Sequence, residues 1–250
     1  DYVSLITGRY PDDLSNDRYT VFDGTNRIGN HVGSYDFALE WIGPKHTLLC
    51  YHQHIYEDAS GLAFQNFPDG LTGISISKKN TSPTRAPALD KLTFEYLSTT
   101  NQSGAIFDPT AQYQGTDNYF NHGQYQEGWS YRGHTLGTPF IAPGSTLKSE
   151  VQAMFNGHYF PNNQLKVGYI GSKWTLGRNI HLTTRSAFSR NFGSFSKLYS
   201  PSLQQFSHLL SAQIVFPKAK GLTLISSAAL DHGDLFAHTF GGYLGLSKRW

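Results

Sequence analysis

Apolar and polar side chains alternate with a period of two along most of the chain, which is the pattern of β-strands. In residues 31–42 one face is bulky and apolar and the opposite face is small or acidic: Tyr35, Phe37, Leu39 and Trp41 against Ser34, Asp36, Ala38 and Glu40. In a soluble sandwich the acids would face water. In a membrane barrel the aromatic face would contact lipid and the acids would line a wet lumen.

The same pattern, with turn residues between the runs, predicts about eleven strands. We expect them at residues 31–42, 46–57, 71–78, 91–99, around 124–134, 148–160, 164–176, 179–193, 204–216, 221–231 and 235–250. Most have the 9–11 residues or more that a tilted membrane strand requires, whereas soluble strands are typically about half that length. Long strands joined by short turns favour an up-and-down sheet that closes into a barrel.

The last predicted strand carries the clearest indication of class. Phe240, Leu244 and Leu246 share one face with the terminal aromatic Trp250, while Tyr243 and Gly245 fall on the other face. An alternating strand that ends on an aromatic residue resembles the terminal strand of bacterial outer-membrane barrels. The alternative is the buried last strand of a soluble barrel.

The predicted strand count is odd, whereas single-chain bacterial barrels have an even number. Either residues 1–30 contain another strand, or the chain is the C-terminal part of a longer protein. Counted back from a periplasmic C-terminus, the connections at 58–68, 100–123 and 194–201 would lie outside the cell. We therefore expect a single barrel domain over residues 1–250, N-terminally incomplete, with a long insertion at 100–147.

Composition agrees with an all-β chain, because aromatic residues make up 14% of it and glycines number 25. A net charge of +2, without a basic run, gives no support for nucleic-acid binding. The single Cys50 excludes an internal disulfide and offers no metal-ligand spacing. No run of 18 apolar residues is present, so a transmembrane helix is not expected.

Residues 117–140, DNYFNHGQYQEGWSYRGHTLGTPF, combine aromatic rings with amides, His and Arg, and glycines recur at 123, 128, 133 and 137. Aromatic faces beside hydroxyl-binding groups suit a sugar, while the glycines allow sharp turns or close approach of a ligand. Packing of a barrel wall is the alternative explanation. If the segment is a regular strand, Trp129 and Tyr131 share a face about 7 Å apart; a bend at Gly128 or Gly133 would instead leave one ring in the wall.

Other chemical sites have weaker support. His52 and His54 are two residues apart and could share a metal, but no third ligand lies nearby, so polar lining of the barrel is favoured. Acidic pairs such as Asp36 and Glu40 are better explained as ionised lumen lining than as a glycosidase pair. No nucleophile or nucleotide motif is present, so we expect neither a catalytic residue nor a cofactor.

The same segment resembles the signature of the capsule-assembly Wzi family, whose members are outer-membrane β-barrels. The matching residues are Tyr119, His122, Tyr125, Gly128, Trp129, Tyr131, Gly133, Leu136, Gly137 and Pro139. Residues 29–43, 56–76 and 94–104 are similar to the Bacteroidetes-type branch of that family.

The resemblance implies a non-catalytic protein of the bacterial outer membrane that binds capsular polysaccharide or exopolysaccharide and helps to anchor or assemble it. Its partners would be that polysaccharide, outer-membrane lipid and the barrel assembly machinery. The implied polysaccharide-binding residues are Tyr119, His122, Tyr125, Trp129 and Tyr131. The alternative is a porin or transport channel for a small solute or saccharide, in which these residues only line the lumen. A membrane-bound enzyme is a more distant third.

Overall fold

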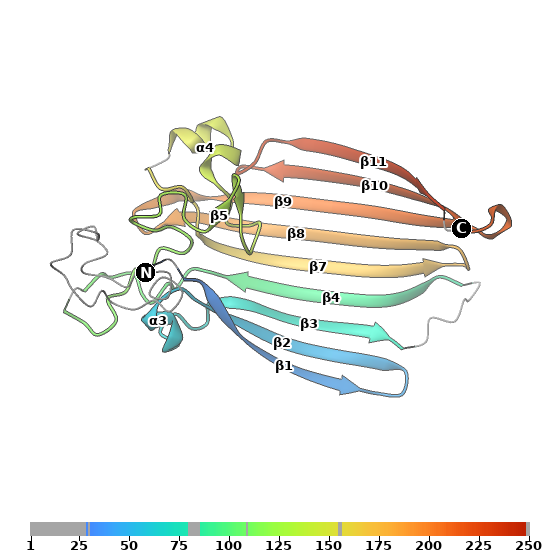
Figure 1. Cartoon of the computed structure of the whole chain (residues 1–250), viewed down its shortest axis with the longest axis horizontal. Helices are drawn as coiled ribbons and strands as arrows, with labels where there is room; N and C mark the ends of the chain where they lie inside the picture. Colours follow the sequence, from blue (N-terminus) through green and yellow to red (C-terminus); the bar gives the residue numbers. More distant parts are fainter. Residues whose placement is uncertain (1–28, 30, 80–85, 109, 155–156, 249–250) are drawn as a thin grey trace.

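A computed structural model describes residues 29, 31–79, 86–108, 110–154 and 157–248. Nine strands form one antiparallel sheet in the order β1-β2-β3-β4-β7-β8-β9-β10-β11 (Figure 1). Their bounds are β1 Gly33–Ile42, β2 His46–Tyr56, β3 Gly70–Lys78, β4 Ala88–Ser98, β7 Gln164–Leu176, β8 Ile180–Ser194, β9 Lys197–Phe216, β10 Leu222–Gly233 and β11 Thr239–Ser247. The prediction of an all-β, antiparallel meander is confirmed.

Each strand of this sheet pairs with its neighbour in sequence, and a long segment separates only β4 from β7. β1 and β11 are the two edges of the sheet as described, so the structure contains no closed barrel. Because the strands alternate in direction, these first and ninth strands run the same way. Residues 1–28 and 30, where a further strand was one of the two expectations, lie outside the described residues.

The two faces of the sheet differ in chemistry. On the outer face, large apolar side chains are exposed on every strand except β2: among them Phe37, Leu39, Trp41, Ile74, Ile76, Phe94, Ile170, Phe188, Leu210, Leu230, Phe240, Leu244 and Leu246. On the inner face the same strands carry mainly polar groups, including Asp36, Glu40, Tyr51, Lys91, Glu95, Lys173, Arg185, Ser207 and Asp231. The facing predicted for β11 is therefore supported by the register of its pairing with β10.

Two of the predicted strands are wrong. Residues 148–160 contain instead the short helix α4, Ser149–Ala153. Leu147 and Val151, four residues apart, are both buried against Leu235, and this is helical rather than strand spacing. The strand expected around 124–134 is reduced to a hairpin of β5 Ser130–Tyr131 and β6 His134–Thr135.

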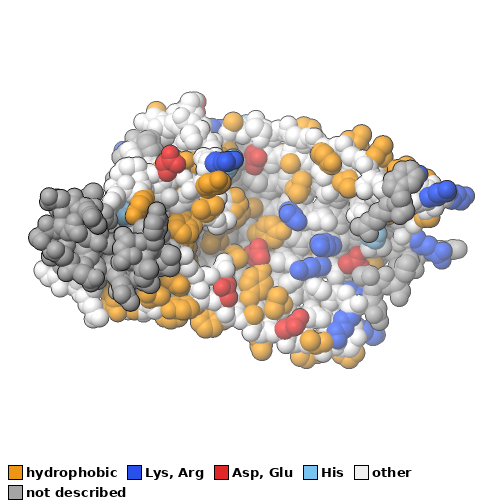
Figure 2. Space-filling view, viewed as in Figure 1, with side chains coloured by type: hydrophobic (Ala, Val, Ile, Leu, Met, Phe, Trp, Pro, Cys, Tyr) orange, Lys and Arg blue, Asp and Glu red, His pale blue; other side chains and the backbone are white. Residues whose placement is uncertain are grey.

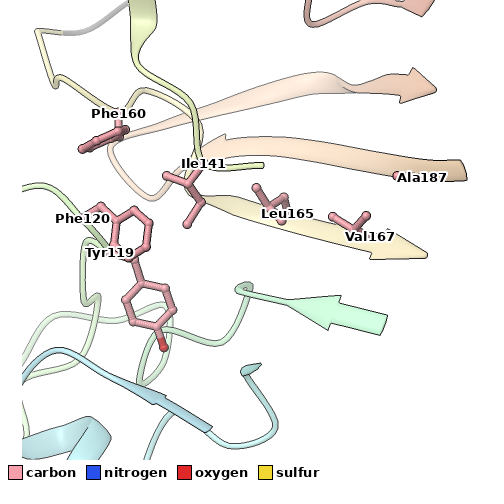
Figure 3. Close-up of a cluster of buried hydrophobic side chains, with 7 residues drawn as sticks. All are labelled: Tyr119, Phe120, Ile141, Phe160, Leu165, Val167 and Ala187. Atoms are coloured by element: carbon pink, nitrogen blue, oxygen red, sulfur yellow. The ribbon is translucent and has the colours of Figure 1, made fainter. Parts of the chain in front are cut away.

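The segment between β4 and β7, residues 99–163, packs on the inner face at one end of the sheet. We call it the insertion. Its apolar residues Tyr119, Phe120, Ile141 and Phe160 form a buried cluster with Leu165, Val167 and Ala187 of β7 and β8 (Figure 3). A second cluster joins Ala142, Leu147 and Val151 to Tyr199 of β9 and Leu235 of the β10–β11 connection. The insertion is thus held by β7, β8 and β9.

Candidate functional site

Tyr119 is the buried centre of the segment 117–140. Its ring has no exposed surface. Its hydroxyl donates to Asp69 Oδ2 at 3.1 Å and accepts from Asn66 Nδ2 at 2.6 Å. The carboxylate of Asp69 also accepts from the backbone N–H groups of Asn101 and Gln102, at 3.1 and 2.8 Å. Tyr119 therefore locks the insertion to the connection before β3, and its ring is not accessible for stacking on a sugar.

Asparagine side chains also hold the same segment. Asn163 Nδ2 donates to the Tyr119 carbonyl at 3.0 Å and to Asn118 Oδ1 at 2.5 Å. Asn121 accepts from the backbone N–H of Phe160 and donates to the carbonyl of Phe160, both at 2.9 Å. A buried polar network with this many satisfied groups fixes one conformation, because each unmade bond would leave a desolvated donor or acceptor.

Three acids lie where the insertion meets the end of β2 and helix α3, Ala59–Leu62. The carboxylate of Glu57 accepts from the backbone N–H of Phe120 at 2.8 Å, yet desolvation raises its pKa well above the usual value. Asp117 accepts from Ser60 Oγ at 2.8 Å and from Ser103 Oγ at 2.5 Å. Desolvation and the nearby charge of Asp58 raise the pKa of Asp117 to about 6. Protonation of these acids is therefore coupled to the packing of the insertion against the end of β2 and helix α3.

The aromatic part of the segment is bent, which corrects the expectation of a regular strand. Gly128 has φ +55°, and a Cβ there would lie 2.0 Å from the carbonyl oxygen of Phe120, so only glycine fits. Arg132 and Gly133 have φ +49° and +77°, as in a tight two-residue hairpin turn. Trp129 is half-buried against the first apolar cluster, whereas Tyr131 is 62% exposed. One ring is in the wall and the other is at the surface.

The predicted site residues are therefore divided among three environments. His122 and Tyr125 contact each other, with ring centroids 4.8 Å apart, and His122 Nδ1 accepts from the Tyr125 backbone N–H at 3.2 Å. Tyr131 is exposed with the Arg132 guanidinium 5.3 Å from its ring centre. Trp129 packs between the hairpin and the first apolar cluster, and Tyr119 is buried. Four of the five retain surface through which a ligand could be contacted.

Cavities on the inner face continue from the insertion along the wall, and sequence reasoning did not identify them. A cavity of about 520 Å³ reaches from Pro139 and Phe140 of the segment to Tyr169 and Arg185, with Asp231 on its side. A second, of about 440 Å³, shares Tyr169 and Arg185 and extends to Lys91 and Lys173. The sequence signal for these cavities was the alternation of charged with apolar residues along β4 and β7. That alternation does not indicate which strands pair with each other.

His52 and His54 do not line the lumen, contrary to expectation. Both lie on the outer face of β2, where His54 is fully buried and its Nε2 is 3.0 Å from the Gly61 carbonyl oxygen. Phe64 stacks on His54 with centroids 4.4 Å apart, and Phe67 contacts His52 edge-on at 5.9 Å. Within the described ranges, no group of three or more His, Cys, Asp or Glu side chains is arranged for a metal. No helix in the same part of the chain is long and apolar enough to cross a membrane.

A scan against protein-family models matches residues 1–213 to the capsule assembly protein Wzi. The chain belongs to the Wzi capsule assembly family. No curated protein and no solved structure matches the chain.

The Wzi match covers the signature segment, the acid cluster and β1 to β8, and it assigns the chain a role in capsule assembly. Wzi proteins are outer-membrane proteins and are generally not catalytic. The Bacteroidetes-type branch stays a prediction, because the match does not distinguish branches.

Proposed function

We propose that this Wzi-family chain forms part of an outer-membrane barrel whose insertion binds capsular polysaccharide or exopolysaccharide without catalysing a reaction. The observation that carries the proposal is an exposed aromatic and cationic surface, Tyr131 with Arg132, on an insertion that is rigidly seated at one end of a sheet with an apolar outer face. Outer-membrane lipid and the barrel assembly machinery are the further partners that this location implies.

The outer face of the sheet supports the membrane placement. A soluble protein rarely exposes a continuous apolar surface of this extent, whereas lipid-facing strands require one. Antiparallel closure would need an odd number of further strands between the edges β1 and β11, since these run in the same direction. Nine strands plus an odd number give the even count of bacterial barrels.

The connections support an orientation with the insertion outside the cell. Helix α3, the insertion and the β10–β11 connection all lie at one end of the sheet, while the short turns at 43–45 and 177–179 lie at the other (Figure 1). Outer-membrane barrels have short periplasmic turns and longer external loops. The exposed rings of the insertion would then face the capsule.

The surface of the insertion has the groups that sugar recognition needs. The exposed ring of Tyr131 offers a flat apolar face, and the guanidinium of Arg132 beside it provides donors for hydroxyl or carboxylate oxygens. His122 and Tyr125 form a second aromatic and polar patch. Half-buried Trp129 contributes through its remaining surface and through support of the hairpin.

Substitution of the exposed ring tests the proposal. Tyr131→Ala should weaken retention of polysaccharide on intact cells without reducing the amount of folded protein in the outer membrane. Phe107→Ala is the matched control, because Phe107 is also an exposed aromatic residue of the insertion, at 57%, but lies outside the segment 117–140. Retention is measured by polysaccharide staining and protein abundance by heat-modifiable gel mobility.

Two results would contradict the proposal. One is normal polysaccharide retention in the Tyr131→Ala strain, combined with no binding of capsular polysaccharide by the purified protein. The other is steady ion conductance in liposomes together with that lack of binding, which would indicate the channel alternative.

A further inference from the structure

The inner wall holds three cations close together, away from the segment 117–140. Lys91 of β4, Lys173 of β7 and Arg185 of β8 line the cavity of about 440 Å³. Figure 2 looks onto this face, and Lys and Arg side chains gather over the middle of the sheet, where the surface is hollowed. The only carboxylate among the lining residues is that of Glu95.

Within the part of the chain that the structure describes, no carboxylate forms an ion pair with these cations, and Arg185 has an electrostatic interaction with Tyr169. None of the three side chains makes a hydrogen bond or an ion pair there, and Glu95 instead accepts a hydrogen bond from the hydroxyl of Tyr51. Among the residues that line the cavity, three positive groups therefore stand against a single carboxylate that is already engaged. Low-dielectric walls strengthen the field of such a cluster and raise the local concentration of anions.

The register of the sheet places two of these cations opposite each other, and this pairing lowers the stability of the fold. Lys91 and Lys173 are direct cross-strand partners. Like charges opposite each other destabilise a sheet. A second like-charged pair, Lys166 and Arg190, lies at the strand ends on the outer face, where Arg190 donates to Ser202 at 3.1 Å and neither residue lines a described cavity. Of these two pairs, only the inner one combines charge repulsion with a cavity. Natural sequences keep such an unfavourable pairing mainly at functional sites, where its cost in stability is offset elsewhere.

The wall beside the cations carries two tyrosine rings. Gly171 lies between Thr93 and Arg185 in the register, and the ring of Tyr169 folds across it, so that a Cβ on Gly171 would be 2.5 Å from the Tyr169 hydroxyl. Tyr51 covers Gly73 in the same way. Two tyrosine rings thus lie against the wall next to the basic cluster, from the register row in which Glu95 stands between them, and the glycines give them space.

We infer that Lys91, Lys173 and Arg185 form a second saccharide site that binds an anionic sugar unit, and hence that the polysaccharide is acidic. The inference rests on the proposed function and specifies its substrate class. The Arg185 guanidinium is suited to a bidentate contact with a carboxylate or a sulfate, and the two ammonium groups neutralise the remaining charge. The tyrosine rings contact the apolar face of the sugar. The adjoining cavity connects this site to Phe140 of the insertion.

Oligosaccharide binding to the purified full chain in detergent micelles tests the inference. The probes are a hexamer of galacturonic acid and maltohexaose, which is neutral and of similar length, both titrated by calorimetry at low and high salt. We expect the acidic hexamer to bind more tightly, with an affinity that falls as salt rises. Lys173→Gln and Arg185→Gln should each weaken its binding about tenfold or more.

The controls are on the same two strands but on the opposite face. Lys166→Gln on β7 and Arg190→Gln on β8 remove the same charges and should change affinity by less than about twofold if the site is specific. Lys173→Gln should leave the unfolding midpoint unchanged or raised, because it removes repulsion from Lys91. A purely structural lysine would show the reverse.

Equal binding of the two probes, or equal weakening by the inner and outer variants, would overturn the inference. Its failure is distinguishable from failure of the proposed function. If maltohexaose binding depends on Tyr131 while Lys173→Gln has no effect, the insertion site stands and the inner-wall site falls. If Lys173→Gln weakens binding of the acidic hexamer while Tyr131→Ala changes neither retention on cells nor binding in vitro, the inner-wall site is supported and the insertion site is refuted.

Discussion

Leu210 lies in the middle of the outer face of β9 and tests the proposed contact with lipid most directly. Its side chain is 41% exposed and its register partners are Thr184 and Ala228. Phe206 and Phe216, exposed on the same face, lie four and six residues to either side. The next residue, Ser211, faces inward, where it accepts a hydrogen bond from Ser227 at 2.9 Å.

The strand geometry sets the expected magnitude. Ten residues separate the two phenylalanines, and at about 3.3 Å per residue, with a tilt of about 40°, they span about 25 Å along the membrane normal. That span equals the height of the apolar band of outer-membrane barrels, about 25 Å, with aromatic residues at both borders. Leu210 is then about 3 Å from the midplane, where an arginine costs about 2–4 kcal/mol. Each 1.4 kcal/mol is a factor of about ten in the folding equilibrium.

We therefore expect Leu210→Arg to destabilise the protein by about 2–4 kcal/mol, and Ser211→Arg, with its side chain in the wet lumen, by about 0–1 kcal/mol plus the lost hydrogen bond. Urea titrations of the protein folded in lipid vesicles, followed by tryptophan fluorescence and gel mobility, measure both values. Equal small effects would show that the outer face does not contact lipid. A larger cost for Ser211→Arg would show that the assignment of the faces is reversed.

Two further predictions concern the seating of the insertion. Tyr119→Phe removes the buried hydrogen bonds that the hydroxyl makes with Asn66 and Asp69, and it should destabilise the protein by about 1–3 kcal/mol in the same titration, whereas Tyr131→Phe should cost almost nothing; equal costs would show that the buried hydroxyl is unimportant. The pKa of Asp117 is about 6 in the folded state and about 4 when unfolded, so its protonated form stabilises the insertion fully below about pH 4, and that contribution is lost as the pH rises through 6. Limited proteolysis of the insertion should accordingly become faster from pH 4 to 7, less so in Asp117→Asn; faster cleavage at the acid end would refute the assignment.

The strands and their facing were largely predictable from the sequence. Strand side chains alternate with a period of two, so the apolar series Phe240, Leu244 and Leu246 fixes the face that each residue of β11 presents, without knowledge of its neighbours. The prediction failed at residues 148–160, where alternation was assumed but the burial of Leu147 and Val151 follows a helical spacing. Short amphipathic segments of this kind are ambiguous until the surface that they cover is known.

Within the segment 117–140, composition and family resemblance located the signature but not the role of each aromatic residue. Tyr119 and Tyr131 are chemically identical, and only the tertiary contacts decide that the first is buried against Asn66 and Asp69 while the second is exposed beside Arg132. The positive φ of Gly128 depends on the close approach of the Phe120 carbonyl, which comes from chain folding rather than from local preference.

Only the tertiary structure brings the basic residues of the inner wall together. Periodicity places Lys91 and Lys173 on the inward faces of their strands, but it does not reveal that they are opposite each other. That pairing arises because the insertion, residues 99–163, returns the chain beside β4, so that β7 takes up a register in which the two lysines are direct partners. The sequence determined which face each strand presents, because side-chain direction is a local property of the extended backbone. The fold decided which side chains meet, because register between strands distant in sequence is set by the packing of everything between them.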